Sequence, residues 1–370
     1  MKFTCNQNSL VKALNIVSKA VTARTTIPIL KGILLNVDEN GILTMAASDL
    51  DISIENKIKV DNFEPGEIVV QSKLFGDIIR KLPNDLVNIN ESSGNISIKC
   101  SNSEFNIVGN QSDEFPKVKL HNEASEKYSF EKEFLKEMIR KTSFAASIDE
   151  SRGTITGILI EIKENSLNFV ALDGFRMAVL REECKNNSDQ NIIISAKLLN
   201  ELAKISQESD DASDITMSMA DKRAVFKIGE NISVVLRLLD GDFVAYEKIL
   251  PKNNNKKIVL NKTDLLESIE RASLLAKIGK NNLIILSIKD NIMEITSKSE
   301  EGNVREEVII SNDANELVIG FNSKYLIDVL KVIDDESIAM YFDTSVSPLL
   351  IKPLSGNQYE YLVLPVRITN

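Results

Sequence analysis

The chain has 370 residues, of which 43% are hydrophobic and 26% charged, the balance of an ordinary soluble globular protein. Its formal net charge of −10 argues mildly against a nucleic-acid partner. The opening segment MKFTCNQNSL lacks the apolar core of a signal peptide, and no apolar run reaches the roughly 20 residues that span a membrane. Three cysteines, Cys5, Cys100 and Cys184, are far apart in sequence, which indicates a reducing cytoplasm rather than a disulfide framework.

The first predicted element is a short strand that leads into an amphipathic helix, and the chain contains it three times. The three segments are KFTCNQNSLVKAL (2–14), KYSFEKEFLKEMI (127–139) and KIVLNKTDLLESI (257–269). Their apolar spacing predicts helices over 8–20, 131–142 and 262–277. Asn8, Glu133 and Thr263 lie near the helix starts, where short polar or acidic side chains can accept from free N–H groups.

A pair of apolar strands follows each of these helices. The first strands of the pairs are GILLNV (32–37), GILIEI (157–162) and LIILSI (283–288). The second are GILTMAASD (41–49), NSLNFVALD (165–173) and NIMEITSKS (291–299). Their apolar runs and alternation are typical of strands that have at least one buried face.

A second helix is also repeated, in QSKLFGDIIRKLP (71–83), SAKLLNELAKIS (195–206) and NSKYLIDVLKVI (322–333). The spacing predicts helices over 72–82, 196–206 and 323–333. In the first copy one apolar stripe is expected to contain Leu74, Phe75, Ile78, Ile79 and Leu82.

One unit of about 115 to 125 residues therefore occurs three times. The polar segments LHNEASEK (120–127) and PKNNNKK (251–257) are the predicted joints. We predict three α+β domains over 1–122, 127–250 and 256–370, each with two helices packed on antiparallel sheets.

The six predicted helices together contain more bases than acids, although the whole chain is acidic. If their polar faces share one side, that side would attract phosphates. The plainer interpretation of any one helix is a solvated surface, and lysine is also a good helix former.

Motifs for catalysis or metal binding are missing from the sequence. The one histidine, His121, falls in a predicted joint, and there is neither a P-loop nor a G-x-G-x-x-G. We expect no catalytic residue, no metal site and no cofactor. Asp-Gly in LDGFR (172–176) and LDGDF (239–243) indicates turns.

Several short segments, in this order and spacing, resemble the bacterial DNA polymerase III β subunit, the sliding clamp family, over essentially the whole chain. They are MKFT (1–4), RTTIPIL (24–30), LDGFRMA (172–178), LLDGDF (238–243), ILPK (249–252), RASLLA (271–276) and LPVR (364–367). RTTIPIL and RASLLA most resemble clamps of low-GC Gram-positive bacteria.

The resemblance implies a DNA-clamp fold in which two subunits join head to tail into a ring, with the helices inside and the sheets outside. It implies a cytoplasmic, non-catalytic processivity factor that encircles duplex DNA and is loaded by a separate clamp loader. The family's duplex-contacting residues fall by position on Arg24, Lys73, Arg152 and Lys197.

The resemblance also implies a hydrophobic cleft that binds short peptides of the replicative DNA polymerase, repair polymerases and mismatch-repair proteins. The matching positions are Ile155, Leu172, Gly174, Phe175, Arg176, Met177, Val244, Lys248, Ile249, Pro348, Leu362, Leu364, Val366 and Arg367. Phe175 stands where the family usually has histidine, and Val244 where it often has proline, so the peptide preference is expected to shift. The plainer interpretation of Leu362 and Leu364 is a last strand with one face in the core.

The implied subunit seam of the homodimer has Phe105 and Ile107 on one side and Leu274 and Leu275 on the other. Two other functions stay open at this point. One is an adaptor that binds peptides without DNA, against which the basic helices argue. The other is an enzyme with chemistry that no motif reveals.

Overall fold

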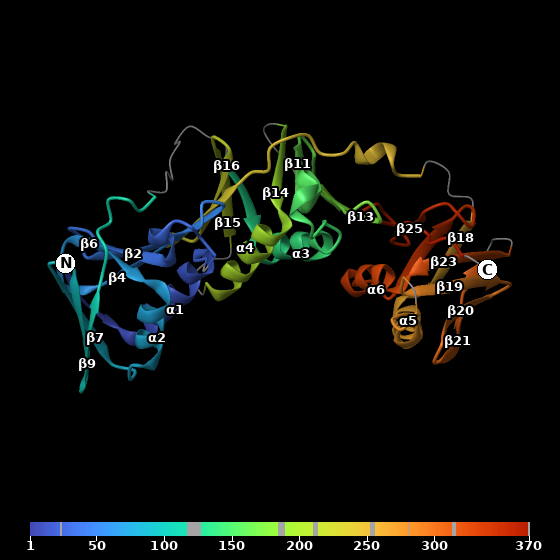
Figure 1. Cartoon of the computed structure of the whole chain (residues 1–370). Coiled ribbons are helices and arrows are strands. Elements are labelled where there is room, and N and C mark those ends of the chain that lie inside the picture. The colour runs from blue at the N-terminus through green and yellow to red at the C-terminus, as the bar shows by residue number, and fades with distance from the viewer. Residues whose placement is uncertain are drawn as a thin grey trace. The chain divides into compact units, whose positions relative to one another are not determined.

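The computed structural model describes residues 1–22, 24–116, 127–183, 189–209, 214–251, 256–279, 281–312 and 316–368 (Figure 1). Contacts divide the chain into two units. Unit 1 comprises residues 1–135 and 198–238, and unit 2 comprises residues 136–197 and 239–370. Each unit therefore takes strands from two successive repeats.

Unit 1 contains an eight-stranded and a five-stranded sheet. The first has the order β10 (Lys127–Glu131), β15 (Asp214–Ala220), β16 (Arg223–Ile228), β17 (Ile232–Arg237), β4 (Ile52–Lys59), β3 (Ile42–Ser48), β2 (Gly32–Val37) and β6 (Gly66–Gln71). The second has the order β5 (Asp61–Glu64), β1 (Lys2–Asn6), β7 (Leu86–Ser92), β8 (Asn95–Cys100) and β9 (Ser103–Val108). Helix α1 (Gln7–Val17) packs on β3, β4 and α2 (Ser72–Lys81).

Unit 2 contains a nine-stranded and a four-stranded sheet. The first has the order β14 (Gln190–Ser195), β11 (Gly157–Lys163), β12 (Ser166–Leu172), β13 (Arg176–Glu183), β26 (Tyr359–Val363), β25 (Leu349–Lys352), β24 (Ser337–Phe342), β18 (Lys256–Asn261) and β22 (Ser311–Asn312). The second has the order β21 (Gly302–Ile309), β20 (Ile292–Ser299), β19 (Leu283–Lys289) and β23 (Leu317–Asn322). Helix α5 (Lys262–Ala276) packs on the second sheet and on α6 (Ser323–Val332).

The two long sheets correspond strand for strand. Read from β10 to β6, the eight strands of unit 1 match β18, β24, β25, β26, β13, β12, β11 and β14 of unit 2 in repeat position. In both sheets the central pair, β17 with β4 and β26 with β13, joins one repeat to the next through antiparallel hydrogen bonds. Because sheets are shared in this way, contacts cut through the middle repeat, and the three-domain boundaries stay a prediction.

All six predicted helices are present, including α3 (Lys132–Ser143) and α4 (Ala196–Glu208), with ends that differ from the prediction by a few residues. Their caps lie earlier than expected. Asn6 and Asn261 accept from the helix N–H groups, rather than Asn8 or Thr263, because a capping residue must precede the first helical residue. In α2 the apolar stripe is buried apart from Leu74, which is 46% exposed. No helix in the described ranges is long and apolar enough to cross a membrane.

A buried ion cluster holds β13, β25 and β26 together in unit 2. Glu360 of β26 is 7% exposed and lies 2.6 Å from Arg181 of β13 and 2.5 Å from Lys352 of β25. Burial acts to raise the pKa of Glu360, but the hydrogen bond from Lys352 and the charge of Arg181 outweigh it, so the pKa lies below its ordinary value. The carboxylate therefore stabilises the fold where it is ionised and loses this contribution as pH falls.

Replacing Glu360 by glutamine is expected to lower the free energy of unfolding by about 2 kcal/mol at pH 7, because two basic groups lose a charged partner. Since the folded pKa is depressed, the deficit should be complete above the ordinary value of 4.5 and shrink as pH falls below it. Urea unfolding at pH 7 and in acid measures this. A deficit of the same size at both pH values would assign the effect to packing instead of charge.

Candidate functional site

Three lysines occupy the same place in the three copies of the second helix. Lys73 of α2, Lys197 of α4 and Lys324 of α6 each follow the first helical residue, and each is exposed. Within the described residues, none of the three ammonium groups has an acidic partner. Such groups are available to phosphate oxygens. The sequence analysis selected the first two and missed Lys324, although the repeat itself marks that position.

Bases farther along the same helices are paired with acids. The pairs are Arg80 with Asp77 at 2.9 Å, Lys204 with Glu201 at 2.8 Å, and Lys331 with Glu270 at 2.8 Å. Their charges are compensated locally, so they contribute less to phosphate attraction than the sequence count of bases suggested.

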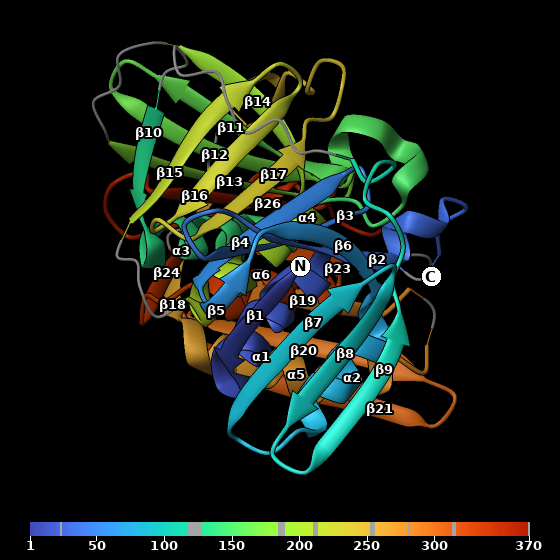
Figure 2. The same cartoon turned by 90° about the vertical axis from the view of Figure 1, so that its left-hand side faces the viewer.

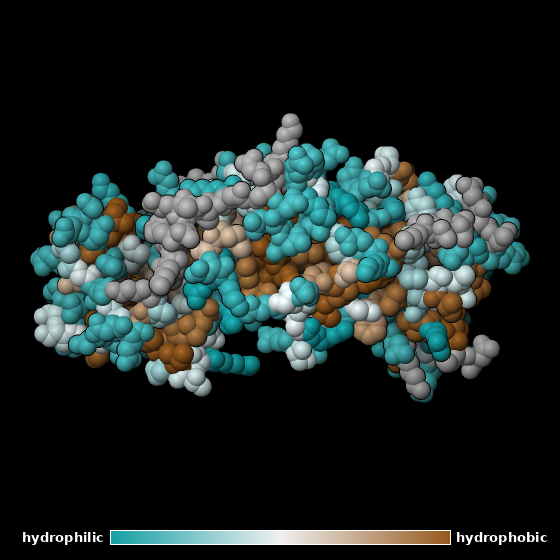
Figure 3. Space-filling model, turned by 90° about the horizontal axis from the view of Figure 1, so that it is seen from above, coloured by the Kyte–Doolittle hydropathy of each residue, from teal (hydrophilic) through white to brown (hydrophobic). Residues whose placement is uncertain are grey.

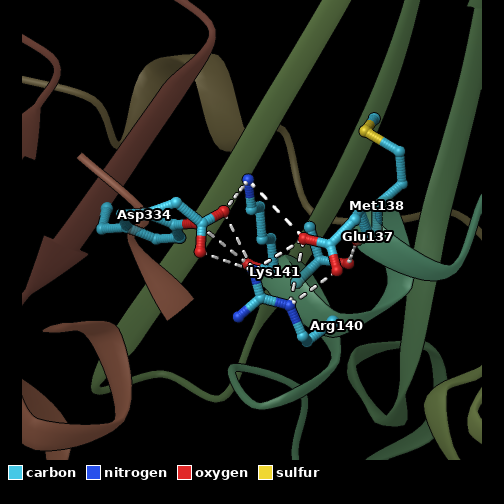
Figure 4. Close-up of polar contacts among 7 residues, drawn as sticks. Glu137, Met138, Arg140, Lys141 and Asp334 are labelled. Atoms are coloured by element: carbon cyan, nitrogen blue, oxygen red, sulfur yellow. Dashed lines mark hydrogen bonds and ion pairs between the residues drawn. The ribbon is translucent and has the colours of Figure 1, made fainter. Parts of the chain in front are cut away.

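The end of α3 shows the same compensation (Figure 4). Arg140 lies 2.6 Å from Glu137 and 3.0 Å from Asp334, and Lys141 lies 2.7 Å from Asp334. The hydrogen bond from Arg140 holds the pKa of Glu137 below its ordinary value, so this carboxylate stays charged near neutral pH. These two bases are engaged with acids.

The other two residues expected to contact duplex DNA lie outside the six α-helices, with Arg152 in the 3₁₀ helix Glu150–Thr156. Arg24 is exposed, with its backbone N–H bonded to Thr22 Oγ1. Arg152 donates a hydrogen bond to the backbone oxygen of Asp173 at 2.5 Å. The structure thus places Arg152 beside the turn at residues 173–176, among the residues expected for the cleft.

The floor of the expected cleft lies on one face of the nine-stranded sheet. Leu172, Met177 and Leu362 are at most 6% exposed and belong to one cluster of buried apolar residues. Ile155 and Leu364 are partly buried and pack against this cluster. Five of the predicted cleft residues are therefore brought together by the sheet.

The turn between β12 and β13 places residue 175 at the rim of this floor. The Asp173 carboxylate accepts hydrogen bonds from the backbone N–H groups of Phe175 and Arg176 at 2.8 and 3.0 Å. Gly174 has a φ of 88°, a conformation that suits glycine because it has no Cβ. Phe175 is left 54% exposed, and its ring stacks on Tyr325 of α6 with centroids 6.0 Å apart.

The guanidinium of Arg176, a residue expected in the cleft, is already engaged by carboxylates and aromatic rings. Its guanidinium bonds Asp173 at 3.1 Å and Asp328 at 2.6 Å. It also lies 4.8 Å from the ring centroid of Tyr325 and 5.3 Å from that of Phe144. With two carboxylates beside it, this side chain fixes the aromatic wall instead of attracting an acidic ligand.

The remaining predicted cleft residues lie on three segments of unit 2. Val244, Lys248 and Ile249 are exposed on the segment that follows β17. The others are Pro348 before β25 and the chain end, where the backbone N–H of Val366 donates to Gly320 at 2.8 Å and Arg367 is exposed. Figure 3 shows hydrophobic residues on the surface that it draws, in patches between hydrophilic ones.

Sequence reasoning missed three aromatic side chains near this floor. Phe243 and Tyr246 pack against the buried cluster, and the Tyr246 hydroxyl donates to Glu161 at 3.1 Å. The apolar run around Val244 carried the signal for both. Tyr325 could have been noticed because the other two copies of its helix have leucine there, at Leu74 and Leu198.

The residues expected at the seam lie at an open sheet edge and at a helix end. Phe105 and Ile107 are on β9, the edge strand of the five-stranded sheet (Figure 2). They pair with Ile98 and Ile96, which are fully buried, yet Phe105 is 40% exposed because no strand follows. Leu274, at the end of α5, is 65% exposed and Leu275 is partly buried.

Within the described residues, no group of three or more His, Cys, Asp or Glu side chains could hold a metal ion. His121 and Cys184 lie outside those residues. Cys5 and Cys100 are free and buried, and burial raises the pKa of Cys5 to about 11, which keeps its thiol protonated.

Comparisons with known proteins agree over the whole chain. Residues 1–119, 129–244 and 247–367 match the N-terminal, central and C-terminal domains of the DNA polymerase III beta subunit. The beta sliding clamp of Halalkalibacterium halodurans is 36% identical, with 99% of this chain and 100% of that protein covered.

Solved structures give the same result. A DNA polymerase III β subunit from Eubacterium rectale has a TM-score of 0.94 at 36% identity, with both chains fully covered at 100%. The sliding clamp of Pseudomonas aeruginosa bound to griselimycin has a TM-score of 0.92 at 28% identity, again with 100% of both chains covered.

These matches confirm the resemblance, the α+β clamp fold and the low-GC Gram-positive type that the sequence indicated. A sliding clamp is a processivity factor and not an enzyme, so the possibility of unrecognised catalysis is removed. With three domain models matched in order and a relative aligned from end to end, the chain belongs to the bacterial DNA polymerase III β subunit family, the DNA sliding clamps.

Proposed function

We propose that two copies of this chain join head to tail into a ring around duplex DNA. One observation carries the proposal. Each long sheet joins two repeats at equivalent strands, β17 with β4 and β26 with β13. In the two short sheets the strands at these repeat positions, β9 and β21, are open edges. Pairing β9 of one copy with β21 of the next would complete a third long sheet, and two copies would close the ring.

The ring would contact DNA through weak, sequence-independent charges. Lys73, Lys197 and Lys324, which have no acidic partner in the part of the chain that the structure describes, would touch phosphates, while acids along the same helices would dilute the field. Weak and numerous contacts suit sliding, since they carry no sequence information. Arg24 stays a proposed contact, and Arg152 is proposed only as a base near both DNA and the cleft rim.

The cleft of unit 2 would hold peptides of the replicative polymerase, of repair polymerases and of mismatch-repair proteins. Its apolar floor suits aliphatic and aromatic anchors, and Phe175 with Tyr325 adds an aromatic wall. Griselimycin, present in the related Pseudomonas clamp structure, is proposed to bind this chain as well. Tethering raises the local concentration of polymerase at DNA without changing its active site.

We further propose a cytoplasmic location, a separate clamp loader as partner and no membrane or cofactor. The domain boundaries 1–122, 127–250 and 256–370 fit the repeated elements and stay part of this proposal.

Retention on plasmid DNA tests the ring. The protein is loaded onto a nicked circular plasmid by a clamp loader and followed by gel filtration before and after the circle is cut once. A topological link predicts that protein stays on the circle and leaves the linear form. Equal retention on both forms would contradict the ring and favour the peptide-binding adaptor.

Replacing Phe105 by aspartate is expected to convert the dimer into monomers at micromolar concentration. The change puts a charge where the apolar row of the five-stranded sheet would meet the next subunit, and burying an unpaired charge is costly. Sedimentation velocity measures the species. Val108→Asp, on the opposite face of β9 and 75% exposed, is the matched control and should stay dimeric. A dimeric Phe105→Asp protein would remove β9 from the seam.

A further inference from the structure

The turn that shapes the cleft in unit 2 is built a second time in unit 1, between β3 and β4. Asp49 Oδ1 accepts from two backbone N–H groups, of Asp51 at 3.1 Å and of Ile52 at 2.8 Å, as Asp173 does in the cleft. Leu50 has a φ of 79°, close to the value at the glycine of the cleft turn. The two turns share their hydrogen bonds and their left-handed second residue.

The strand next to each turn, β17 in unit 1 and β26 in unit 2, also has the same register in the two units. The backbone N–H of Arg237 donates to Asp51 at 2.8 Å, and that of Leu364 donates to Phe175 at 2.8 Å. Arg237 and Leu364 therefore stand at equivalent rim positions, as do Asp51 and Phe175.

The floors of the two sites differ in chemistry although their strand pairing is equivalent. Directly opposite residues form the row Leu172, Met177, Leu362 and Leu350 in unit 2 and the row Ser48, Ser53, Val235 and Val225 in unit 1. In unit 1 the hydroxyls of Ser48 and Ser53 hydrogen-bond each other at 2.7 Å. Two hydroxyls thus replace the leucine and methionine that anchor the apolar floor of the cleft.

The rim is also apolar in unit 2 and polar in unit 1. Phe175 and Leu364 in unit 2 correspond to Asp51 and Arg237 in unit 1, whose charged groups lie 3.6 Å apart and are both exposed. An apolar anchor that entered here would desolvate the exposed charged pair without replacing its partners, which disfavours binding. The buried serines below it, 1% and 4% exposed, offer less apolar surface to an anchor than Leu172 and Met177 do.

We propose that unit 1 carries an inactive copy of the peptide cleft, closed to apolar anchors by the side chains of Ser48, Asp51, Ser53 and Arg237. The inference rests on the proposed function of the cleft in unit 2. It assigns ligand selectivity to these four positions of the repeat, since the turn hydrogen bonds and the strand register are the same in both sites.

The test moves the four cleft side chains into unit 1 of the full-length protein. The variant carries Ser48→Leu, Asp51→Phe, Ser53→Met and Arg237→Leu, and isothermal titration with griselimycin counts sites. The parent should bind one molecule per chain and the variant two. Adding Phe175→Asp, Met177→Ser and Leu364→Arg to the variant should leave one site, the one in unit 1.

A simpler variant guards against overpacking of the floor. Asp51→Phe with Arg237→Leu changes only exposed rim residues, so the fold should persist, and a second, weaker site is expected at millimolar ligand. Folded variants that keep one site per chain overturn the inference and leave the cleft intact. A parent that binds no griselimycin, and also no polymerase peptide, rejects the cleft and the inference together.

Discussion

Replacing both Phe175 and Leu364 by alanine is expected to weaken peptide binding by about 100-fold, because each removes an apolar contact at the rim of the cleft. Phe175 is exposed and stacks on Tyr325, while Leu364 packs against the buried floor. Neither side chain lies deep in the core, so the ring and its retention on circular DNA should be unchanged. Fluorescence anisotropy with a labelled polymerase peptide measures the affinity.

Val318→Ala is the matched control for this variant. Val318 is also apolar, lies in unit 2 and is 51% exposed, but it is on β23 and outside the expected cleft. It should bind peptide as the parent does. Parental affinity in the double variant, with the control unchanged, would move the peptide site elsewhere on the surface.

Changing Lys73, Lys197 and Lys324 to glutamine is expected to flatten the salt dependence of duplex binding. Each phosphate contact that is lost should lower the slope of log affinity against log salt by about 0.9, so three lysines in each of two subunits give a large change. The slope is measured by anisotropy with a labelled duplex between low and physiological salt.

The control removes the same number of positive charges from the same three helices, α2, α4 and α6. Arg80, Lys204 and Lys331 are each within 2.9 Å of a carboxylate, so their exchange for glutamine removes charge without removing an available phosphate contact. The slope should change little. Equal slopes in the two triple variants would show that only net charge matters and that the equivalent lysines are not contacts.

The sequence predicted most of the local structure because the hydrophobic period is a local property. A 3.6-residue stripe in KFTCNQNSLVKAL or QSKLFGDIIRKLP specifies a helix whatever surrounds it, and all six helices formed. The capping residue of the first helix was predicted wrongly because Asn6 and Asn8 are equally polar. Only the position of the first helical residue, Gln7, decides which of them can cap. Leu74 was predicted in the apolar stripe, and it is the one member of that stripe that stays exposed.

The candidate site was less predictable, because charge and burial depend on neighbours distant in sequence. Arg176 was expected among the cleft residues, and Asp328, more than 150 residues away, pairs with its charge while Tyr325 lies over its guanidinium. Arg152 stays a predicted DNA contact, and the structure adds that it donates to the backbone oxygen of Asp173 beside the turn at residues 173–176. Neither outcome follows from residue type or from spacing along the chain.

By itself the sequence determined the threefold repeat, the helix and strand order and, through its resemblance, the clamp family, since all of these are recorded in local patterns and their spacing. Only the tertiary structure decided which lysines keep free charges and which rows of side chains form a floor. It also showed that successive repeats share one sheet, and that equivalent rows of this sheet are apolar in unit 2 and partly polar in unit 1. The physical reason is that hydrogen-bonded strands and ion pairs join residues far apart in the chain, and these contacts set burial and charge at the site.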